Sequence, residues 1–390
     1  MSEWKTVKLG DVCEIITGNT PSTKNEQYYS SKDIPFIKPS DLPANFFSEI
    51  NTSEFFISES ARPISRIIPK NSVLVSCIGI IGKVGISKRE VSFNQQINAL
   101  IPNINQIDYK YLASAILNKK KYISEKANAA VVPIINKTEF SNLEIPLPPL
   151  ETQKQIAAVL DKCTSLISKY KKILEKYDTL IKSRFIEMFG ENPIENGKWS
   201  TKQLSKVCTV TSSKRIYAEE QSNSGVPFLR ISDLVSRING SIENELFIPI
   251  EKFITFKNDG LVPKTDDILI TSRGTLGLCY IIRPDDNFYF QDGMITWLSF
   301  ENHEEILSIF LDYLFRTIIQ KKINEKTNGA TVKYVSIADL KQLTIPVPPI
   351  FLQNSFATFV QQIDKSKFAV QKSLEKAETL YKSLMQEYFG

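Results

Sequence analysis

Residues 151–190 read ETQKQIAAVLDKCTSLISKYKKILEKYDTLIKSRFIEMFG, and no proline or glycine interrupts them before Gly190. Apolar or bulky residues recur in alternating steps of three and four, which predicts one long helix with a heptad seam. The predicted seam consists of Ile156, Val159, Cys163, Leu166, Tyr170, Ile173, Tyr177 and Leu180. At ~1.5 Å per residue such a helix reaches about 50–60 Å. A helix this long cannot bury its own apolar stripe, so it requires a partner.

The partner lies in the same chain, because residues 351–390 have a similar register. Their predicted seam consists of Phe356, Phe359, Ile363, Ser366, Val370, Ser373, Ala377 and Leu380. Both stretches end alike, in Phe189-Gly190 and Phe389-Gly390, and both follow a proline-rich segment. Proline biases the residue before it towards extended backbone, so these segments predict stiff entries into the two helices.

The rest of the chain is also duplicated, with four segments recurring in the same order. The pairs are Trp4–Cys13 with Trp199–Cys208, Pro35–Leu42 with Pro227–Leu234, Asn71–Ser76 with Asp266–Thr271, and Leu143–Leu150 with Leu343–Ile350. We therefore predict globular domains at 1–150 and 191–350, with long helices at 151–190 and 351–390. Short β-branched runs beside glycine, together with helical spacing elsewhere, indicate an α+β fold with a small sheet. The second helix must run back along the first, which predicts an antiparallel coiled-coil pair and a pseudo-two-fold repeat.

Composition places few limits on the function. The chain has 390 residues, 42% hydrophobic content and a formal net charge of +5, which permits a polyanionic partner. No apolar run is long enough to cross a membrane, and the amino-terminal residues lack the apolar core of a signal peptide. The five cysteines are scattered, which favours reduced thiols in a cytoplasmic protein over disulfides or a zinc site.

Motifs of catalysis are missing from the sequence. The segment Gly79–Val84 contains Gly-Lys but lacks the spacing and the following Ser/Thr of a phosphate-binding loop. His303 is the single histidine, and acidic residues flank it. No methyltransferase loop and no carboxylate–lysine cluster of a metal nuclease is present. We therefore expect no catalytic residue, no metal and no cofactor in this chain.

Polar and basic residues instead recur at corresponding places in the two domains. Asn and Gln can pair with adenine and Arg with guanine, while Ser, Thr and Lys suit phosphate contacts. The DNA-binding candidates in the first domain are Thr17, Asn19, Thr20, Lys24, Lys38, Ser40, Ser76, Lys83, Asn94, Gln95, Gln96 and Asn128. Those in the second are Ser213, Lys214, Arg215, Arg230, Ser232, Ser272, Arg273, Thr275, Gln291, Asn328 and Lys333.

Each of these residues taken alone could simply be a polar loop tip or a turn former. The pattern of differences favours recognition, because the motifs are kept between the repeats while the residues beside them change. Ile78 corresponds to Arg273, and Lys83 corresponds to Leu278. Two recognition domains built on one scaffold, with different specificities, would show this pattern.

The chain resembles the specificity subunit of Type I restriction-modification systems over nearly its full length. The resemblance depends on the duplicated Trp-x-x-x-x-Leu-x-x-Val openings, the P-F-[IL]-[KR]-x-S-D-L segments, the IPLPP and IPVPP exits and the two helices ending in Phe-Gly. It implies that each domain is a target recognition domain for one half of a split site in double-stranded DNA. It also implies that the helices set the spacing and hold two adenine-N6 methyltransferase subunits.

Motor-nuclease subunits would complete the restriction enzyme, with AdoMet, ATP and Mg²⁺ on the partner subunits and no membrane involved. Two alternatives remain at this point. The chain could be a coiled-coil scaffold that displays two protein-binding domains, or a free-standing methyltransferase or nuclease with an unfamiliar site.

Overall fold

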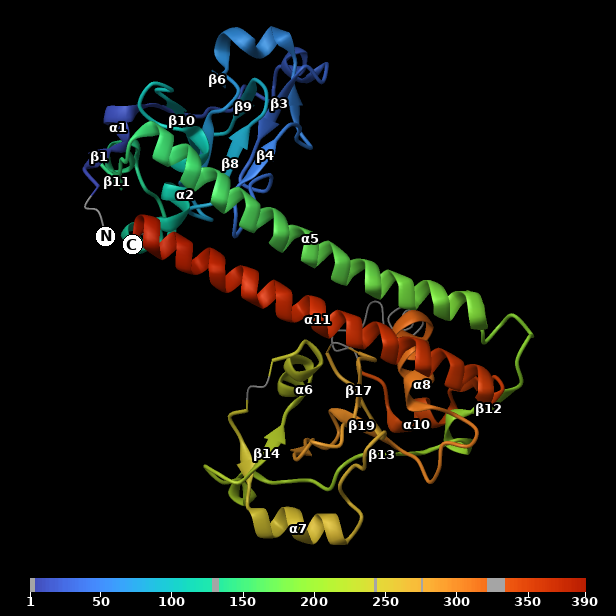
Figure 1. Cartoon of the computed structure of the whole chain (residues 1–390). Coiled ribbons are helices and arrows are strands. Elements are labelled where there is room, and N and C mark those ends of the chain that lie inside the picture. The colour runs from blue at the N-terminus through green and yellow to red at the C-terminus, as the bar shows by residue number, and fades with distance from the viewer. Residues whose placement is uncertain (1–3, 128–132, 242–243, 275, 321–333) are drawn as a thin grey trace. The chain divides into compact units, whose positions relative to one another are not determined.

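The computed structural model describes residues 4–127, 133–241, 244–274, 276–320 and 334–390 (Figure 1). The chain divides into two compact units, and each contains parts of both long helices. Unit 1 comprises Met1–Lys172 and Val370–Gly390, and unit 2 comprises Ile173–Ala369. The long helices are α5 (Leu150–Phe189) and α11 (Ile350–Phe389).

Unit 1 is built on two small sheets. The five-stranded sheet has the order β2 (Cys13–Thr17), β10 (Ile97–Pro102), β7 (Val73–Ser76), β8 (Val84–Ser87), β4 (Ser48–Ile50). The second sheet has the order β5 (Phe56–Ile57), β3 (Ile34–Ile37), β9 (Val91–Phe93), β6 (Ile67–Ile68). A separate pair joins β1 (Thr6–Lys8) to β11 (Glu144–Pro146). The helices are α1 (Leu9–Val12), α2 (Tyr109–Asn118), α3 (Lys120–Ala127) and α4 (Lys137–Ser141), with 3₁₀ turns at Glu26–Tyr29 and Glu59–Ile64.

Unit 2 repeats this topology. Its four-stranded sheet has the order β13 (Thr209–Thr211), β19 (Ile295–Ser299), β16 (Ile268–Thr271), β17 (Cys279–Ile281). Its three-stranded sheet has the order β15 (Phe247–Ile248), β14 (Val226–Leu229), β18 (Tyr289–Phe290), and β12 (Thr201–Gln203) pairs with β20 (Thr344–Pro346). The helices are α6 (Ile231–Ile238), α7 (Ile250–Asn258), α8 (Ser308–Leu314) and α10 (Ile337–Gln342), with a π-turn at Phe315–Ile319 and 3₁₀ turns at Leu204–Lys206 and Ala218–Glu220.

The predicted α+β fold and its internal repeat are therefore confirmed. In each unit one sheet contains a parallel pair, β3 with β9 and β14 with β18. The strand orders β2-β10-β7-β8 and β13-β19-β16-β17 correspond strand for strand. Unit 1 combines the first half of α5 with the last half of α11, and unit 2 combines the other halves. Within each unit the two helices therefore run antiparallel, as predicted.

The start of each long helix is fixed to its domain by a buried glutamine. Gln153 accepts a hydrogen bond from the backbone N–H of Asp108 at 2.9 Å and donates to the carbonyl oxygens of Gln106 and Pro148. Gln353 repeats this arrangement with the N–H of Leu307 and the carbonyls of Glu305 and Pro348. Both glutamines are fully buried. A buried amide is tolerated because its partners satisfy it, so each glutamine fixes a helix orientation.

The end of each long helix is fixed by the phenylalanine of its Phe-Gly terminus. In unit 1, Phe389 packs on Tyr111 of α2 with ring centroids 5.1 Å apart. In unit 2, Phe189 packs on Phe310 of α8 at 4.9 Å and on Phe356 at 5.7 Å. Such ring pairs add about 0.5–1.5 kcal/mol beyond the area that they bury. The Phe-Gly sequences that end the two long helices therefore place a phenylalanine in equivalent packing sites of the two units.

The predicted seam is wrong at every second position of α5. Leu160, Ile167, Leu174 and Ile181 face inward, instead of the predicted Val159, Leu166, Ile173 and Leu180, which are exposed. Ile156, Cys163, Tyr170 and Tyr177 are buried or half-buried. At each of these positions the sequence has two consecutive apolar residues. A seam with steps of four and then three residues therefore fits the sequence as well as the predicted seam with steps of three and then four. The same shift occurs in α11, where Val360 and Tyr381 are buried, Phe359 is half-buried and Leu380 is exposed.

Candidate nucleic-acid interface

In unit 1 the candidate residues gather at one edge of the five-stranded sheet. Because neighbouring strands are antiparallel, β2 and β7 end at the edge where β10 and β8 begin. Thr17 ends β2, Ser76 ends β7, Lys83 precedes β8, and Asn94, Gln95 and Gln96 precede β10. Lys38 and Ser40 join this edge, because Asn94 donates a backbone hydrogen bond to Ile37 and the Lys83 ammonium donates to Pro39.

Unit 2 gathers its candidates at the corresponding edge. There β13 and β16 end, and β19 and β17 begin. Ser213, Lys214 and Arg215 follow β13, Ser272 and Arg273 follow β16, and Gln291 precedes β19. Arg230 and Ser232 follow β14, and the N–H of Gln291 donates to the carbonyl of Leu229. The duplicated fold thus presents two sets of polar residues in equivalent positions.

Some candidates in unit 1 hold this edge together instead of facing solvent. Ser76 is fully buried, and its hydroxyl accepts the N–H of Lys83 at 2.9 Å. Asn94 is buried and bonds to Gln96, while Asn19 bonds to Ile64 and Arg66 across the loop. Burial and satisfied hydrogen bonds favour a positioning role for these side chains.

Other candidates in unit 1 remain exposed. Thr17, Thr20, Lys24, Ser40 and Gln95 are exposed, and the hydroxyl of Thr20 donates to Gln95 at 2.7 Å. Lys38 is half-buried, with its ammonium 3.0 Å from the ring centroid of Phe55. Gly18 makes this packing possible, because a Cβ there would lie 2.2 Å from the carbonyl oxygen of Asn94. The polar loop after β2 therefore lies against the loop before β10.

In unit 2 two of the candidate arginines are ion-paired. Arg215 lies 2.8 Å from Asp292, which raises the pKa of the guanidinium. Arg230 forms ion pairs with Asp233 and Glu245. These contacts raise the pKa of its guanidinium, and the hydrogen bond to Asp233 contributes most. Ser272 is buried, and its hydroxyl bonds to the hydroxyl of Thr296. The hydroxyl of Ser213 donates to the carbonyl of Phe290. Ser232 and Lys214 are exposed. Asn128, Thr275, Asn328 and Lys333 lie outside the described residues.

Two aspartates that shape the segments after β3 and β14 are site residues that were not among the predicted candidates. The carboxylate of Asp41 accepts the backbone N–H of Lys38 at 2.7 Å, and that of Asp233 accepts the N–H of Arg230 at 2.8 Å. The recurring Ser-Asp-Leu motif was the available signal. Its aspartate acts on the backbone three residues earlier, and so orients the basic residue that precedes the motif.

The turns after β7 and β16 have the same backbone conformation. Gly79 and Gly274 have φ of 74° and 73°, and Gly82 and Gly277 both have φ of 75°. Only glycine adopts this region freely, which explains why these four positions repeat. The N–H of Gly82 donates to Ser76 at 2.9 Å, and the N–H of Gly277 donates to Thr271 at 2.8 Å.

The buried cysteines nearest these sheet edges are not activated as nucleophiles. Burial raises the pKa of the Cys77 thiol to about 12 and that of Cys279 well above its usual value. A reactive cysteine needs a lowered pKa, so these thiols are packing residues. Among the described residues, no group of three or more His, Cys, Asp or Glu side chains could hold a metal ion. No helix in that part of the chain is long and apolar enough to cross a membrane.

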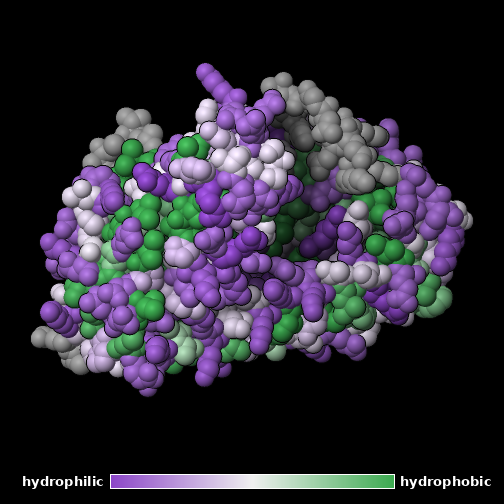
Figure 2. Space-filling model, turned by 90° about the horizontal axis from the view of Figure 1, so that it is seen from above, coloured by the Kyte–Doolittle hydropathy of each residue, from purple (hydrophilic) through white to green (hydrophobic). Residues whose placement is uncertain are grey.

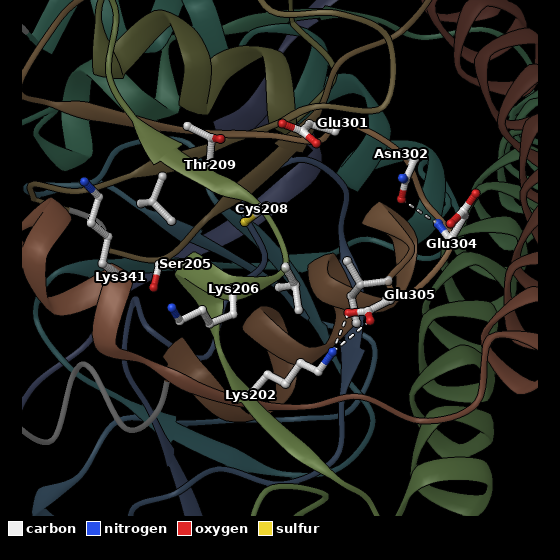
Figure 3. Close-up of a pocket in the computed structure, with 13 residues that line it drawn as sticks. Lys202, Ser205, Lys206, Cys208, Thr209, Glu301, Asn302, Glu304, Glu305 and Lys341 are labelled. Atoms are coloured by element: carbon white, nitrogen blue, oxygen red, sulfur yellow. Dashed lines mark hydrogen bonds and ion pairs between the residues drawn. The ribbon is translucent and has the colours of Figure 1, made fainter.

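A cavity of about 770 Å³ lies at the opposite end of the unit 2 sheet, before β13 and after β19 (Figure 3). It is lined by lysines and glutamates, and Lys202 reaches both carboxylate oxygens of Glu305 at 2.8 Å. Cys208 in its wall has a pKa raised to about 12 by burial. An ion pair between Lys202 and Glu305 and an unactivated thiol at Cys208 give this cavity no nucleophile.

The geometry thus places the two sets of candidate residues at equivalent sheet edges, which are called the recognition edges below. The chain matches the Type I restriction modification DNA specificity domain over residues 1–176 and 196–378, and it belongs to this family. Membership makes it a targeting subunit for DNA sequence recognition and not an enzyme in its own right.

Individual relatives cover nearly the whole chain. It is 26% identical to the Type I restriction enzyme MjaIX specificity subunit of Methanocaldococcus jannaschii, over 95% of this chain and 89% of that protein. It is 20% identical to the Type I restriction enzyme EcoBI specificity subunit of Escherichia coli, over 99% of this chain and 85% of that protein. The S subunit structure from M. genitalium superposes with a TM-score of 0.61 at 17% identity, covering 100% of this chain and 96% of that one. That likeness shows the shared fold.

Proposed function

We propose that this chain directs a Type I restriction-modification complex to a bipartite DNA site, with each domain reading one half of the site. The observation that carries the proposal is the equivalence of the two sheet edges. Each edge presents polar and basic side chains from the same strand ends, held by the same glycine turns. Equivalent scaffolds with different side chains suit the reading of two different short sequences. For two half-sites on one face of B-DNA, the centres would lie about 34–36 Å apart, one helical turn.

The long helices support a second part of the proposal, the docking of two adenine-N6 methyltransferase subunits. Hydrophobic residues are interspersed with hydrophilic ones on the face in Figure 2, so a single exposed apolar residue is ordinary. On α5, however, the exposed residues Val159, Leu166, Ile173 and Leu180 recur every seven positions. Residues seven apart lie on one helix face, which makes an outer apolar stripe. An additional helix from a methyltransferase subunit would bury it.

The catalytic chemistry then belongs to the partners. We propose that AdoMet binds the methyltransferase subunits, and that ATP and Mg²⁺ bind the motor-nuclease subunits that carry out restriction. The five buried free cysteines fit a reducing compartment, and the DNA partner fits the cytoplasm.

A domain exchange tests the bipartite reading. Replacing residues 1–150 by those of a relative is expected to change one half of the selected DNA site and to leave the other half and the spacer length intact. The site is found by selection from a randomised duplex library and by mapping methylated adenines in the assembled complex. A change in both halves, or in neither, would contradict the modular reading.

Salt dependence separates this function from that of a protein-binding scaffold. Phosphate contacts release counterions, so the affinity for the selected duplex should fall steeply and linearly on a logarithmic salt scale. A scaffold for proteins would select no DNA sequence at any salt concentration. Methyl transfer or cleavage by the purified chain alone would instead support an enzyme.

A further inference from the structure

One isolated backbone bridge occurs at the recognition edge of both units. In unit 1 it pairs Ile78 with Ile134, and in unit 2 it pairs Arg273 with Tyr334. The supporting hydrogen bonds also correspond: the N–H of Ile135 donates to Cys77, and the N–H of Val335 donates to Ser272, both at 3.0 Å. The bridge is made by the backbone, so it leaves the side chains free to differ.

The unit 1 bridge carries an apolar group of side chains. Ile78 is half-buried, Ile134 is 46% exposed, and Ile80 in the adjoining turn is 63% exposed. The neighbouring Cys77 and Ile135 supply the buried side of the same segments. Ile80 and Ile134 therefore contribute little to the core of the domain. Two exposed isoleucines and the half-buried Ile78, beside polar residues, are suited to an apolar contact outside the chain.

The unit 2 bridge carries a cation and an aromatic ring instead. Arg273 is exposed, and Tyr334 is 48% exposed. Among the described residues no carboxylate lies within 4.0 Å of the Arg273 guanidinium, whereas Arg215 and Arg230 at the same edge are both ion-paired. Its guanidinium makes a weak contact with the sulfur of Met294, at 3.9 Å. Among the described arginines of this edge, Arg273 is thus the one without a carboxylate partner.

We infer that this bridge is a specificity determinant of each domain: the isoleucines of unit 1 contact a thymine methyl group, and Arg273 of unit 2 pairs with guanine. The inference rests on the proposed function. In the major groove the thymine C5-methyl is the apolar feature, and guanine O6 and N7 match the guanidinium fork. Tyr334, adjacent to Arg273 through the bridge, adds a hydroxyl that can contact phosphate.

Base analogues test the two contacts separately in the full-length chain. For Arg273→Ile, we expect affinity for the selected duplex to fall about 5- to 150-fold, the range of one good bidentate pair. Replacing guanine by 7-deazaguanine at one position of the unit 2 half-site should weaken binding by the wild type and leave the variant unaffected. Arg283→Ile is the matched control, because Arg283 is exposed beyond the opposite end of β17.

Deoxyuridine tests the apolar contact, because it differs from thymidine only by the missing methyl. At one position of the unit 1 half-site it should weaken wild-type binding, and Ile80→Ala with Ile134→Ala should abolish that difference. Ile104→Ala is the control, since Ile104 is 74% exposed beyond the far end of β10.

Failure of this inference and failure of the proposed function give different results. If the wild type selects a bipartite site but neither analogue effect depends on the bridge residues, the inference is overturned and the proposed function stands. If no bipartite site is selected, both fail. For each variant, an unchanged base preference at the half-site of the unmutated domain shows that the protein is folded. Reselection with Ile78→Arg that introduces guanine into the unit 1 half-site would support the inference further.

Discussion

Units 1 and 2 share a backbone plan but carry different side chains at equivalent positions of the helix that packs on the long helices, α2 in unit 1 and α8 in unit 2. In unit 1, helix α2 presents Ala113 and Leu117, and Lys110 forms an ion pair with Asp161 of α5. In unit 2 the equivalent helix α8 and its π-turn present Asp312 and Arg316, which bond at 2.7 Å. Asp312 is buried and Arg316 is half-exposed. The same two helix positions can therefore carry an apolar pair or an ion pair, and mutations can measure the difference.

The largest expected effect concerns the ends of the long helices. Phe189→Ala should destabilise unit 2 by about 3–5 kcal/mol, because the ring is fully buried among other aromatic rings. Phe389→Ala should cost less, since that ring pairs with Tyr111 and retains some exposure. Urea denaturation followed by hydrogen exchange in each unit measures both. Equal losses would show that the two ends are held equally.

The inner and outer faces of α5 give the next prediction. Leu160→Ala should cost about 2–5 kcal/mol, whereas Val159→Ala should change stability by no more than about 0.5 kcal/mol. Val360→Ala tests the equivalent inner position in unit 2, where a smaller side chain predicts a smaller loss. The denaturation midpoint is the measurement. A larger effect at Val159 than at Leu160 would restore the seam expected from the sequence.

The ionic contact of unit 2 can be converted to the apolar pair of unit 1. Arg316→Leu leaves the buried carboxylate of Asp312 without its partner and should cost about 1–3 kcal/mol. Combining it with Asp312→Ala reproduces the Ala113 and Leu117 pair and should recover most of the loss. A double variant as unstable as the single one would show that the pair has a role beyond mutual neutralisation.

A smaller, pH-dependent effect follows from the same carboxylate. Burial raises the pKa of Asp312, and the nearby Arg316 opposes this only in part. The folded state therefore binds the proton more tightly than the unfolded chain, in which the pKa is about 3.9. Relative to Asp312→Asn, the wild type should lose stability as pH rises from about 4 through the raised pKa. Denaturation midpoints of both proteins across this range provide the test. A relative gain in stability would mean that Arg316 dominates.

The sequence predicted the duplication, the long helices and their direction because repeated motifs and absent prolines are local signals. The inner face of α5 could not be chosen, since Val159-Leu160 and Leu166-Ile167 offer two apolar stripes, and only packing against α11 selects one of them. Ser76 and Ser272 were predicted to bind DNA because serine is polar and both lie at the end of short β-branched runs. Their burial depends on strand pairing across the whole domain, which local sequence does not reveal. The bridge of Arg273 with Tyr334 joins residues far apart in the chain, and neither residue type reveals that contact by itself.

The two buried glutamines have a consequence for inheritance. Gln153 and Gln353 occupy equivalent places after the proline-rich segments and bond to equivalent backbone groups. Genetic recombination between the two copies, or with the gene of a relative, would therefore rejoin a domain to a long helix through an interchangeable junction. Under the proposed function, exchange of whole domains would create new pairs of half-sites while each new domain keeps the same glutamine junction to its helix.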